Sequence, residues 1–141
     1  MPVRLLLDAN VLIALSEPRD ELYDRAIADL ERFRQADLVT TMAALMEACL
    51  VLREGFQRTR LHRVIARCGI RLYPLSDPDD VCSGVFEWMR KYAEHQPDWT
   101  DALYAVLSGR EHVLRVWTYD SEFVTIWRRP DGSRIPLAVR R

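Results

Sequence analysis

The stretch "VRLLLDAN", residues 3–10, runs from an apolar segment directly into an acidic residue. Residues 3–7 are short and mostly apolar, which is typical of a parallel strand that is buried on both faces. A helix can begin immediately after Asp8, over residues 9–16. A strand followed at once by a helix is the opening unit of an α/β protein, so this stretch sets the expected fold class.

The same alternation continues along the chain. Further strands are predicted over 37–41, 70–75 and 113–118. Helices are predicted over 20–35, from Thr41 to Gly55, over 58–67, after "SDPDD" at 76–80, and within "QPDWTDALYAVLS" at 96–108. This order predicts a three-layer α/β/α sandwich with a mostly parallel central sheet. Two β-prone runs around "PDG" in the tail add a possible C-terminal β-hairpin.

Length and composition are those of one globular domain spanning residues 1–141. Hydrophobic residues make up 49% of the chain and the net charge is −1, which argues against a wholly basic surface but not against a local basic groove. Three distant cysteines without metal-ligand spacing suit a reduced, cytoplasmic chain. The N-terminus does not have the pattern of a signal peptide, and no segment is long enough to span a membrane.

One carboxylate interrupts the apolar segment "MAALMEACLVL", residues 42–52. An unpaired buried carboxylate is costly, so Glu47 needs a proton or a positive partner from elsewhere in the fold. We expect this helix to be buried nearly all round, either inside the sandwich or against a second subunit.

Five acidic residues from distant parts of the sequence are expected to meet at one edge of the sheet. Asp8 and Asp120 follow the first and last strands, and Glu47 lies on the second turn of the helix after the second strand. Asp98 and Asp101 open the helix before the last strand. Ligands of open α/β sheets bind at the carboxyl ends of the strands. Crowded carboxylates repel one another, and Mg²⁺ or Mn²⁺ would relieve that repulsion and could activate water for phosphodiester cleavage.

Simpler roles remain open for these acids when each is taken alone. Asp8 could be the N-cap of the following helix, and Asp120 could be a turn residue. In "DWTD", Asp98 and Asp101 have the spacing of a capping box, with Asp in place of Glu. A simpler role is weakest for Glu47, because the segment around it has no polar face. The five acids in this order therefore favour a metal site.

The segments "LLLDANVLIAL", "AALMEACLVL", "DWTDALYAVLS" and "VWTYDSEF" resemble the PIN-domain nucleases, and among them the VapC-like ribonuclease toxins of bacterial toxin–antitoxin pairs. The resemblance runs from about residue 3 to 125. It implies a parallel sheet flanked by helices and a Mg²⁺- or Mn²⁺-dependent endoribonuclease acting on RNA. It also implies a homodimer and inhibition by a cognate antitoxin protein.

The resemblance assigns roles to the acids. Asp8, Glu47, Asp101 and Asp120 match the acidic cluster that binds the metal, and Asp98 falls where some members carry an additional acid. Asp8, Glu47 and Asp101 would hold the main ion, directly or through water. Asp120, with Asp98, would orient the attacking water or complete a second metal site.

Two polar residues and an arginine cluster complete the candidate site. Asn10 and Thr118 match positions that commonly support the acids in the family. RNA phosphates need basic contacts, and one predicted helix carries several arginines, three of them at helical spacing: Arg58, Arg60, Arg63 and Arg67. An ordinary solvated helix face is the alternative for this cluster.

Two other functions compete with the nuclease. A haloacid-dehalogenase-like phosphatase also begins with a strand and an Asp, but it needs a second Asp two residues later, where this chain has Asn10. It also needs a well-placed lysine, and the only lysine of this chain, Lys91, is predicted to lie in the middle of a helix. A non-catalytic PIN-like scaffold or binding module is the other alternative, and the presence of all the acids argues against it.

Overall fold

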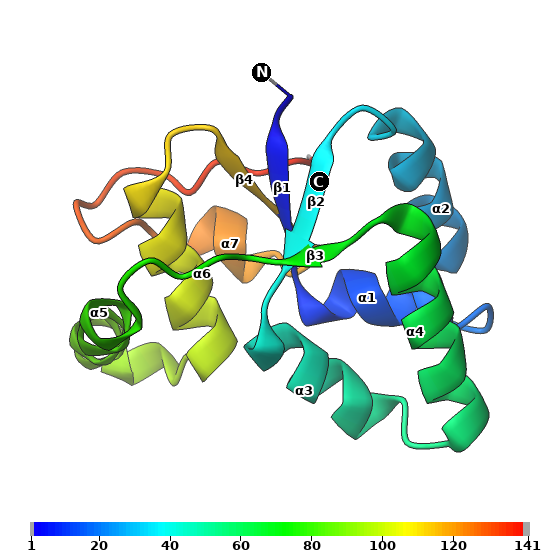
Figure 1. Ribbon diagram of the computed structural model, residues 1–141. Coiled ribbons are helices and arrows are strands. Elements are labelled where there is room, and N and C mark those ends of the chain that lie inside the picture. Colours follow the sequence, from blue (N-terminus) through cyan, green and yellow to red (C-terminus); the bar gives the residue numbers. More distant parts are fainter. Residues whose placement is uncertain (1, 140–141) are drawn as a thin grey trace.

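A computed structural model describes residues 2–139 of the chain (Figure 1). Its centre is a four-stranded parallel sheet in the order β3-β2-β1-β4. The strands are β1 (Arg4–Leu7), β2 (Asp37–Thr40), β3 (Arg71–Leu72) and β4 (Leu114–Trp117). Helices flank this sheet, which confirms the predicted α/β fold with a parallel sheet.

The helices follow the strands in groups. They are α1 (Ala9–Ser16), α2 (Tyr23–Arg32), α3 (Met42–Val51), α4 (Gly55–Cys68), α5 (Pro78–Lys91), the 3₁₀ turn η1 (Ala93–His95), α6 (Trp99–Arg110) and α7 (Glu122–Thr125). Helices α1, α2 and α4 lie on one side of the strands and α5 and α6 on the other (Figure 1). None of the helices within residues 2–139 combines the length and the apolarity needed to cross a lipid bilayer.

The strand order reverses next to β1. The chain moves outward from β1 to β2 and β3, and then returns to place β4 on the other side of β1. The connection after β1 leads toward β2, and the connection that ends in β4 leads to the opposite side of β1. The two connections therefore diverge between β1 and β4. In open α/β sheets this switch point is where a binding crevice forms.

The first strand forms the centre of the core. Leu5, Leu6 and Leu7 are all buried, as expected for a strand covered on both faces. Helix α6 is buried along most of its length, and its Tyr104 donates a hydrogen bond to the carbonyl of Leu7 over 2.6 Å. This bond ties the middle of α6 to the end of β1 and so positions the acids at the start of α6.

Helix α3 is not buried nearly all round within the chain. Only Ala44 and Ala48 are fully buried, and its apolar outer face is exposed, with Leu50 at 74%. The helix packs with one side on α1 and α6 at the end of the sheet, rather than inside a layer. Its N-cap is Thr41, as predicted, whose hydroxyl accepts a hydrogen bond from the amide of Ala44.

The helix predicted over 20–35 is shortened to α2, and two further predicted boundaries are wrong. Gly55 does not end α3 but begins α4, where Glu54 and Gln57 form a capping box. The strand predicted over 70–75 is reduced to Arg71–Leu72, because Pro74 has no backbone N–H to donate and the segment lies at the edge of the sheet.

The predicted C-terminal hairpin is also wrong as a regular pair of strands. Its first run forms α7 instead, and a single antiparallel bridge between Arg128 and Arg134 flanks the turn. The second run crosses to the sheet, where Leu137 bridges Val116 of β4 in parallel. Buried Trp127 anchors the segment between α7 and the turn. Residues 126–139, called the strap below, therefore pack against the edge of the sheet at β4.

Candidate functional site

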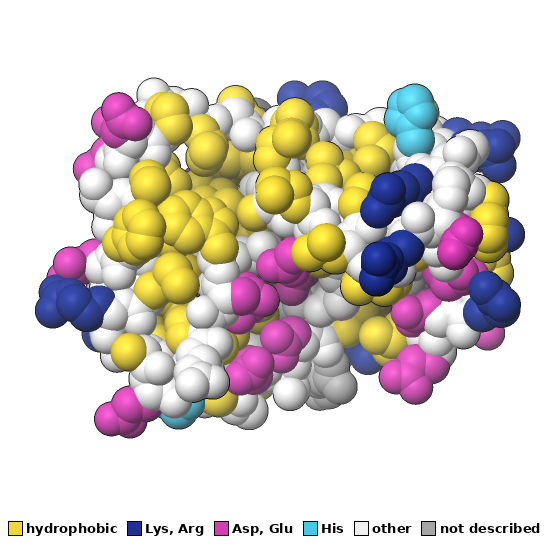
Figure 2. All heavy atoms as spheres, turned by 90° about the horizontal axis from the view of Figure 1, so that it is seen from below, with side chains coloured by type: hydrophobic (Ala, Val, Ile, Leu, Met, Phe, Trp, Pro, Cys, Tyr) yellow, Lys and Arg dark blue, Asp and Glu magenta, His cyan; other side chains and the backbone are white. Residues whose placement is uncertain are grey.

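A cavity of about 210 Å³ lies at the carboxyl ends of β1 and β4. All five predicted acids line it: Asp8, Glu47, Asp98, Asp101 and Asp120. Figure 2 looks onto this end of the molecule and shows acidic side chains gathered near the middle of the face. Among residues 2–139, no arginine or lysine is part of the lining. The cavity therefore concentrates negative charge without a positive side chain of its own.

Asp8 is both a helix cap and a wall of this cavity. Its Oδ1 accepts a hydrogen bond from the amide of Ala9 over 2.8 Å, so the capping role is real. Its Oδ2 accepts from the hydroxyl of Thr118, also over 2.8 Å. Only 6% of Asp8 is exposed. Burial raises the pKa of this carboxyl to about 7, against the opposing effect of those two hydrogen bonds.

Asn10 and Thr118 connect the ends of β1 and β4. The Thr118 hydroxyl donates to Asp8 and accepts from the amide of Asp120 and from the Asn10 side chain, over 3.1 and 3.2 Å. The Asn10 Oδ1 in turn accepts from the amide of Tyr119. The single hydrogen and both lone pairs of the hydroxyl are thereby used, which holds Asp8 and Asp120 in a fixed relation.

Asp98 and Asp101 form the capping box that their spacing allows. The Asp98 side chain accepts from the amide of Asp101 over 2.8 Å, and the Asp101 side chain accepts from the amide of Asp98 over 3.2 Å. Both residues nevertheless line the cavity. Burial, followed by the charges of Asp98 and Asp8, raises the pKa of Asp101 to about 8. Capping thus orients these acids without removing them from the cavity.

Asp120 also combines a turn role with a place in the cavity. Its Oδ1 accepts from the amide of Glu122 over 2.9 Å, at the start of α7. This is the local turn bond that an aspartate commonly makes. Its second oxygen remains available to the cavity.

Glu47 has a hydroxyl as its partner. Its Oε1 accepts a hydrogen bond from the Thr100 side chain over 2.6 Å. Thr100 is only 2% exposed and lies on the first turn of α6 between the two capping acids. Burial raises the pKa of Glu47, Thr100 lowers it, and the charge of Asp98 raises it again. Sequence reasoning missed Thr100, although its place inside "DWTD" was the available signal.

The donor set suits a hard divalent cation. The lining offers carboxylate oxygens from several elements, and the raised pKa values of Asp8 and Asp101 reflect negative charge that is both buried and crowded. Mg²⁺ and Mn²⁺ prefer such oxygens, and Mg²⁺ usually keeps several of its waters. Within the described part of the chain, no three acidic, histidine or cysteine side chains already enclose one ion position. The donor types of the lining therefore fit such an ion, although the described side chains do not converge on one ion position.

The arginine cluster does not reach the acids. Arg58 donates instead to the carbonyls of Leu52 and Cys49 and so caps the end of α3. The other three arginines line a separate hollow of about 310 Å³ between α2 and α4: Arg60, Arg63 and Arg67. Arg60 also pairs with Glu17 over 3.5 Å.

The fold and this cavity define an α/β domain with an acidic site at the switch point of a parallel sheet. The sequence pattern of the PIN domain matches residues 5–126, which is most of the chain. The chain therefore belongs to the PIN domain family. PIN domains are generally nucleases and typically depend on a divalent metal. A comparison with curated proteins finds no match for the chain.

Proposed function

We propose that this protein is a Mg²⁺- or Mn²⁺-dependent endoribonuclease. The observation that carries the proposal is the single cavity lined by five carboxylates, without a balancing arginine or lysine among the described lining residues. Membership of the PIN family supports the reaction class. It leaves the haloacid-dehalogenase-like phosphatase without support, whereas a non-catalytic PIN-like scaffold remains the competing function.

Each residue has a role in this reaction. Asp8, Glu47 and Asp101 would hold the ion, directly or through water. The bound ion would supply Lewis acidity toward a phosphate and lower the pKa of a water molecule. Asp120, which Thr118 holds beside Asp8, would orient the attacking water and accept its proton, with Asp98 assisting. Asn10 would keep Thr118 in place through its hydrogen bonds to the Thr118 hydroxyl and the Tyr119 amide.

The direct test is cleavage of a labelled RNA by the purified protein with EDTA or with Mn²⁺. We expect no cleavage in EDTA, cleavage after Mn²⁺ is restored, and internal cuts in an RNA whose ends are blocked. The competing scaffold function predicts RNA left intact at every metal concentration and no shift of the melting temperature by Mn²⁺ or Mg²⁺. Metal-dependent internal cleavage would support the nuclease, and intact RNA without a melting-temperature shift would support the scaffold.

We expect Thr100→Val to weaken Mn²⁺ binding about tenfold or more, because residues that hold a metal ligand in place commonly contribute that much. Valine has nearly the shape of threonine but cannot donate to Glu47. Thr100→Ser keeps the hydroxyl and should retain most of the affinity. The measurement is a calorimetric titration with Mn²⁺. Equal affinities for the valine and serine variants would show that the Thr100 hydroxyl does not orient Glu47.

The metal-free protein should lose stability as the pH rises. The folded pKa values of Asp8 and Asp101, about 7 and 8, lie above those of an unfolded aspartate, so the folded state binds more protons and stability falls between about pH 4 and pH 8. In EDTA, the melting temperature of the wild type relative to Asp8→Asn should therefore decrease from pH 5 to pH 8. Mg²⁺ competes with the protons and should stabilise the wild type more at pH 8 than at pH 6. A relative melting temperature that rises with pH would contradict the raised pKa of Asp8.

We propose further that the protein is the toxin of a toxin–antitoxin pair and forms a homodimer, with a cognate antitoxin as its inhibitor. The VapC-like motifs support the toxin role, and the exposed apolar face of α3 supports contact with a second copy. Expression of the wild type should arrest bacterial growth, whereas the Asp8→Asn variant should not. Light scattering should show a dimer that Leu50→Glu dissociates.

RNA phosphates would then contact the exposed arginines of α4. Arg63 and Arg67 are exposed, and no ion pair involving them is found among the described residues. Of the four arginines predicted to bind RNA, these two remain available, since Arg58 caps α3 and Arg60 pairs with Glu17.

A further inference from the structure

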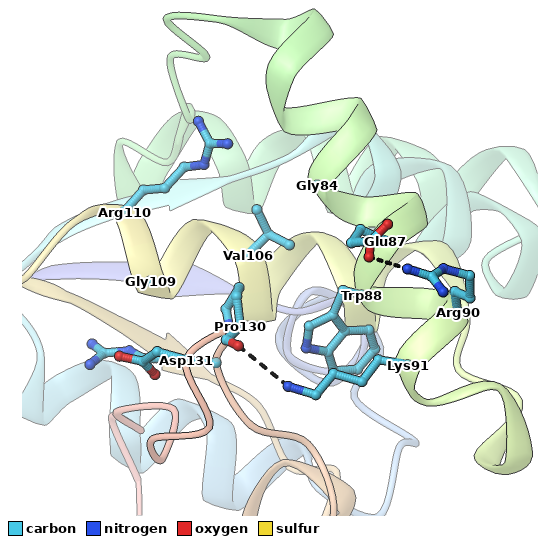
Figure 3. Close-up of a pocket in the computed structure, with 11 residues that line it drawn as sticks. Gly84, Glu87, Trp88, Arg90, Lys91, Val106, Gly109, Arg110, Pro130 and Asp131 are labelled. Carbon is cyan, nitrogen blue, oxygen red and sulfur yellow. Dashed lines mark hydrogen bonds and ion pairs between the residues drawn. The ribbon is translucent and has the colours of Figure 1, made fainter.

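A second cavity, of about 640 Å³, lies between α5, α6 and the tail strap (Figure 3). It shares no lining residue with the acidic cavity. The two cavities lie toward opposite ends of α6, since Asp101 and Arg110 are nine residues apart and therefore about 13 Å apart along the helix axis. Its volume is in the range of pockets that hold small organic ligands.

The floor of this cavity is apolar. Apolar atoms make up the larger part of its accessible lining, and Pro130 is exposed there. Trp88 and Val106 lie beneath this surface, at 2% and 3% exposure, and the indole N–H of Trp88 donates to the carbonyl of Arg128 over 2.8 Å. A Cβ added at Gly84 would already be in van der Waals contact with Val106, at 3.6 Å, so a larger side chain there would extend into the cavity or against α6. Figure 3 shows Trp88 and Lys91 extending from α5 toward Pro130 across the space. A flat or apolar ligand body fits such a floor.

The rim of the cavity is mainly basic, although the chain as a whole is slightly acidic. Four cationic residues line it against two acidic ones: Arg90, Lys91, Arg110 and Arg129 against Glu87 and Asp131. Arg90 and Glu87 pair with each other, and Ser133 donates two hydrogen bonds to Asp131.

Two of the cations remain poorly satisfied. Within the described part of the chain, the only hydrogen bond found for the Lys91 side chain is a long one of 3.4 Å to the carbonyl of Pro130. The Nε–H of Arg129 is buried and has no hydrogen-bond partner within residues 2–139. A buried donor without a partner is unfavourable, and a phosphate that draws this guanidinium toward the cavity would remove that cost. Arg110 is paired with the exposed Asp80, which lies outside the lining.

The tail completes this cavity. Arg129, Pro130 and Asp131 lie beyond residue 126, where the PIN match ends. Pro130 packs closely on Gly109, where an added Cβ would come within 3.3 Å of the proline ring. The cavity is therefore composite, with two walls from the PIN domain and one from the strap.

We propose that this composite pocket binds a small phosphate-bearing ligand with a flat or apolar body, represented by a nucleoside diphosphate. The guanidinium of Arg129 and the ammonium of Lys91 would bind the phosphates, since the planar fork of arginine matches phosphate oxygens. The exposed ring of Pro130, above the buried side chains of Trp88 and Val106, would contact the body of the ligand. This site is independent of the proposed nuclease reaction.

The test is calorimetric titration of ADP into the Asp101→Asn protein in EDTA, which removes metal-dependent binding at the acidic cavity. We expect saturable binding that falls about tenfold or more in the double variant Lys91→Gln/Arg129→Gln, because both charge-assisted hydrogen bonds to phosphate are lost. Pyrophosphate should bind at least about tenfold more weakly than ADP, because it cannot bury an apolar body.

Two further variants separate loss of binding from loss of fold. Gly84→Leu fills the space above Val106 without changing any charge, and it should also abolish ADP binding. Arg34→Gln removes an exposed charge just after α2, outside the cavity lining, and should leave the affinity unchanged. Circular dichroism confirms that each variant is folded. No saturable binding of ADP up to millimolar concentration, or unchanged affinity in both pocket variants, would overturn the proposal.

Discussion

Replacing Asp8 by Asn should abolish Mn²⁺-dependent RNA cleavage while the protein stays folded. The loss should reach about a thousandfold or more, because a metal ion provides several kcal/mol of transition-state stabilisation and each 1.36 kcal/mol is a factor of ten in rate. Asparagine keeps an oxygen that can accept from the amide of Ala9, so the cap of α1 survives. It removes the negative charge that would hold the ion. Glu47→Gln should behave in the same way.

The matched control is Glu94→Gln, which neutralises an exposed acid outside the cavity. It should keep wild-type cleavage. Calorimetric Mn²⁺ titration and RNA cleavage are measured on all three variants, with circular dichroism as the check on folding. Full activity in both Asp8→Asn and Glu47→Gln would remove the basis for the metal site. Loss of activity with Mn²⁺ affinity unchanged would assign these acids a role other than holding the ion.

The second large effect is expected in the tail. Trp127→Ala should lower the free energy of unfolding by about 3–5 kcal/mol, the usual range for removing a buried tryptophan. Trp127 is 1% exposed and packs edge-on against Trp88 and Tyr92. A domain of this size has a total stability of about 5–15 kcal/mol, so this loss would be a large fraction of the total. Urea denaturation followed by circular dichroism measures the change.

Trp127→Phe provides the comparison. The indole N–H of Trp127 is buried without a hydrogen-bond partner in the described structure, so phenylalanine removes an unsatisfied donor and keeps most of the ring contacts. Its loss of stability should therefore be clearly smaller than that of alanine. Equal losses, or a negligible loss for alanine, would mean that the strap is not packed on α5 as the structure shows.

Much of the fold could be predicted from local patterns. Short apolar runs ending at Asp8 and before Asp120 define β1 and β4, because a strand buried on both faces needs no polar alternation. The capping signals at Thr41 and in "DWTD" also produce the helix starts seen in the structure. The end of α3 could not be predicted from Gly55, since it depends on contacts that Arg58 makes from the next helix.

The tail shows where local patterns stop being sufficient. Its β-prone residues form a short helix and a strap, because Trp127 finds a buried site on α5 and the open edge of β4 offers backbone partners to Pro136 and Ala138. Neither the aromatic site nor the sheet edge is visible in the tail sequence. Long-range packing outweighs β-propensity there.

By itself, the sequence determined the parallel sheet and the gathering of acids at its carboxyl edge, because both follow from strand periodicity and from the direction of the strands. Only the tertiary structure decided what each acid contacts. It places Glu47 against the hydroxyl of Thr100, fixes Asp8 between Ala9 and Thr118, and keeps the arginines of α4 away from the cavity. Such contacts join residues up to 110 positions apart, and their geometry depends on how whole helices pack. The order of residues in the sequence does not contain that information locally.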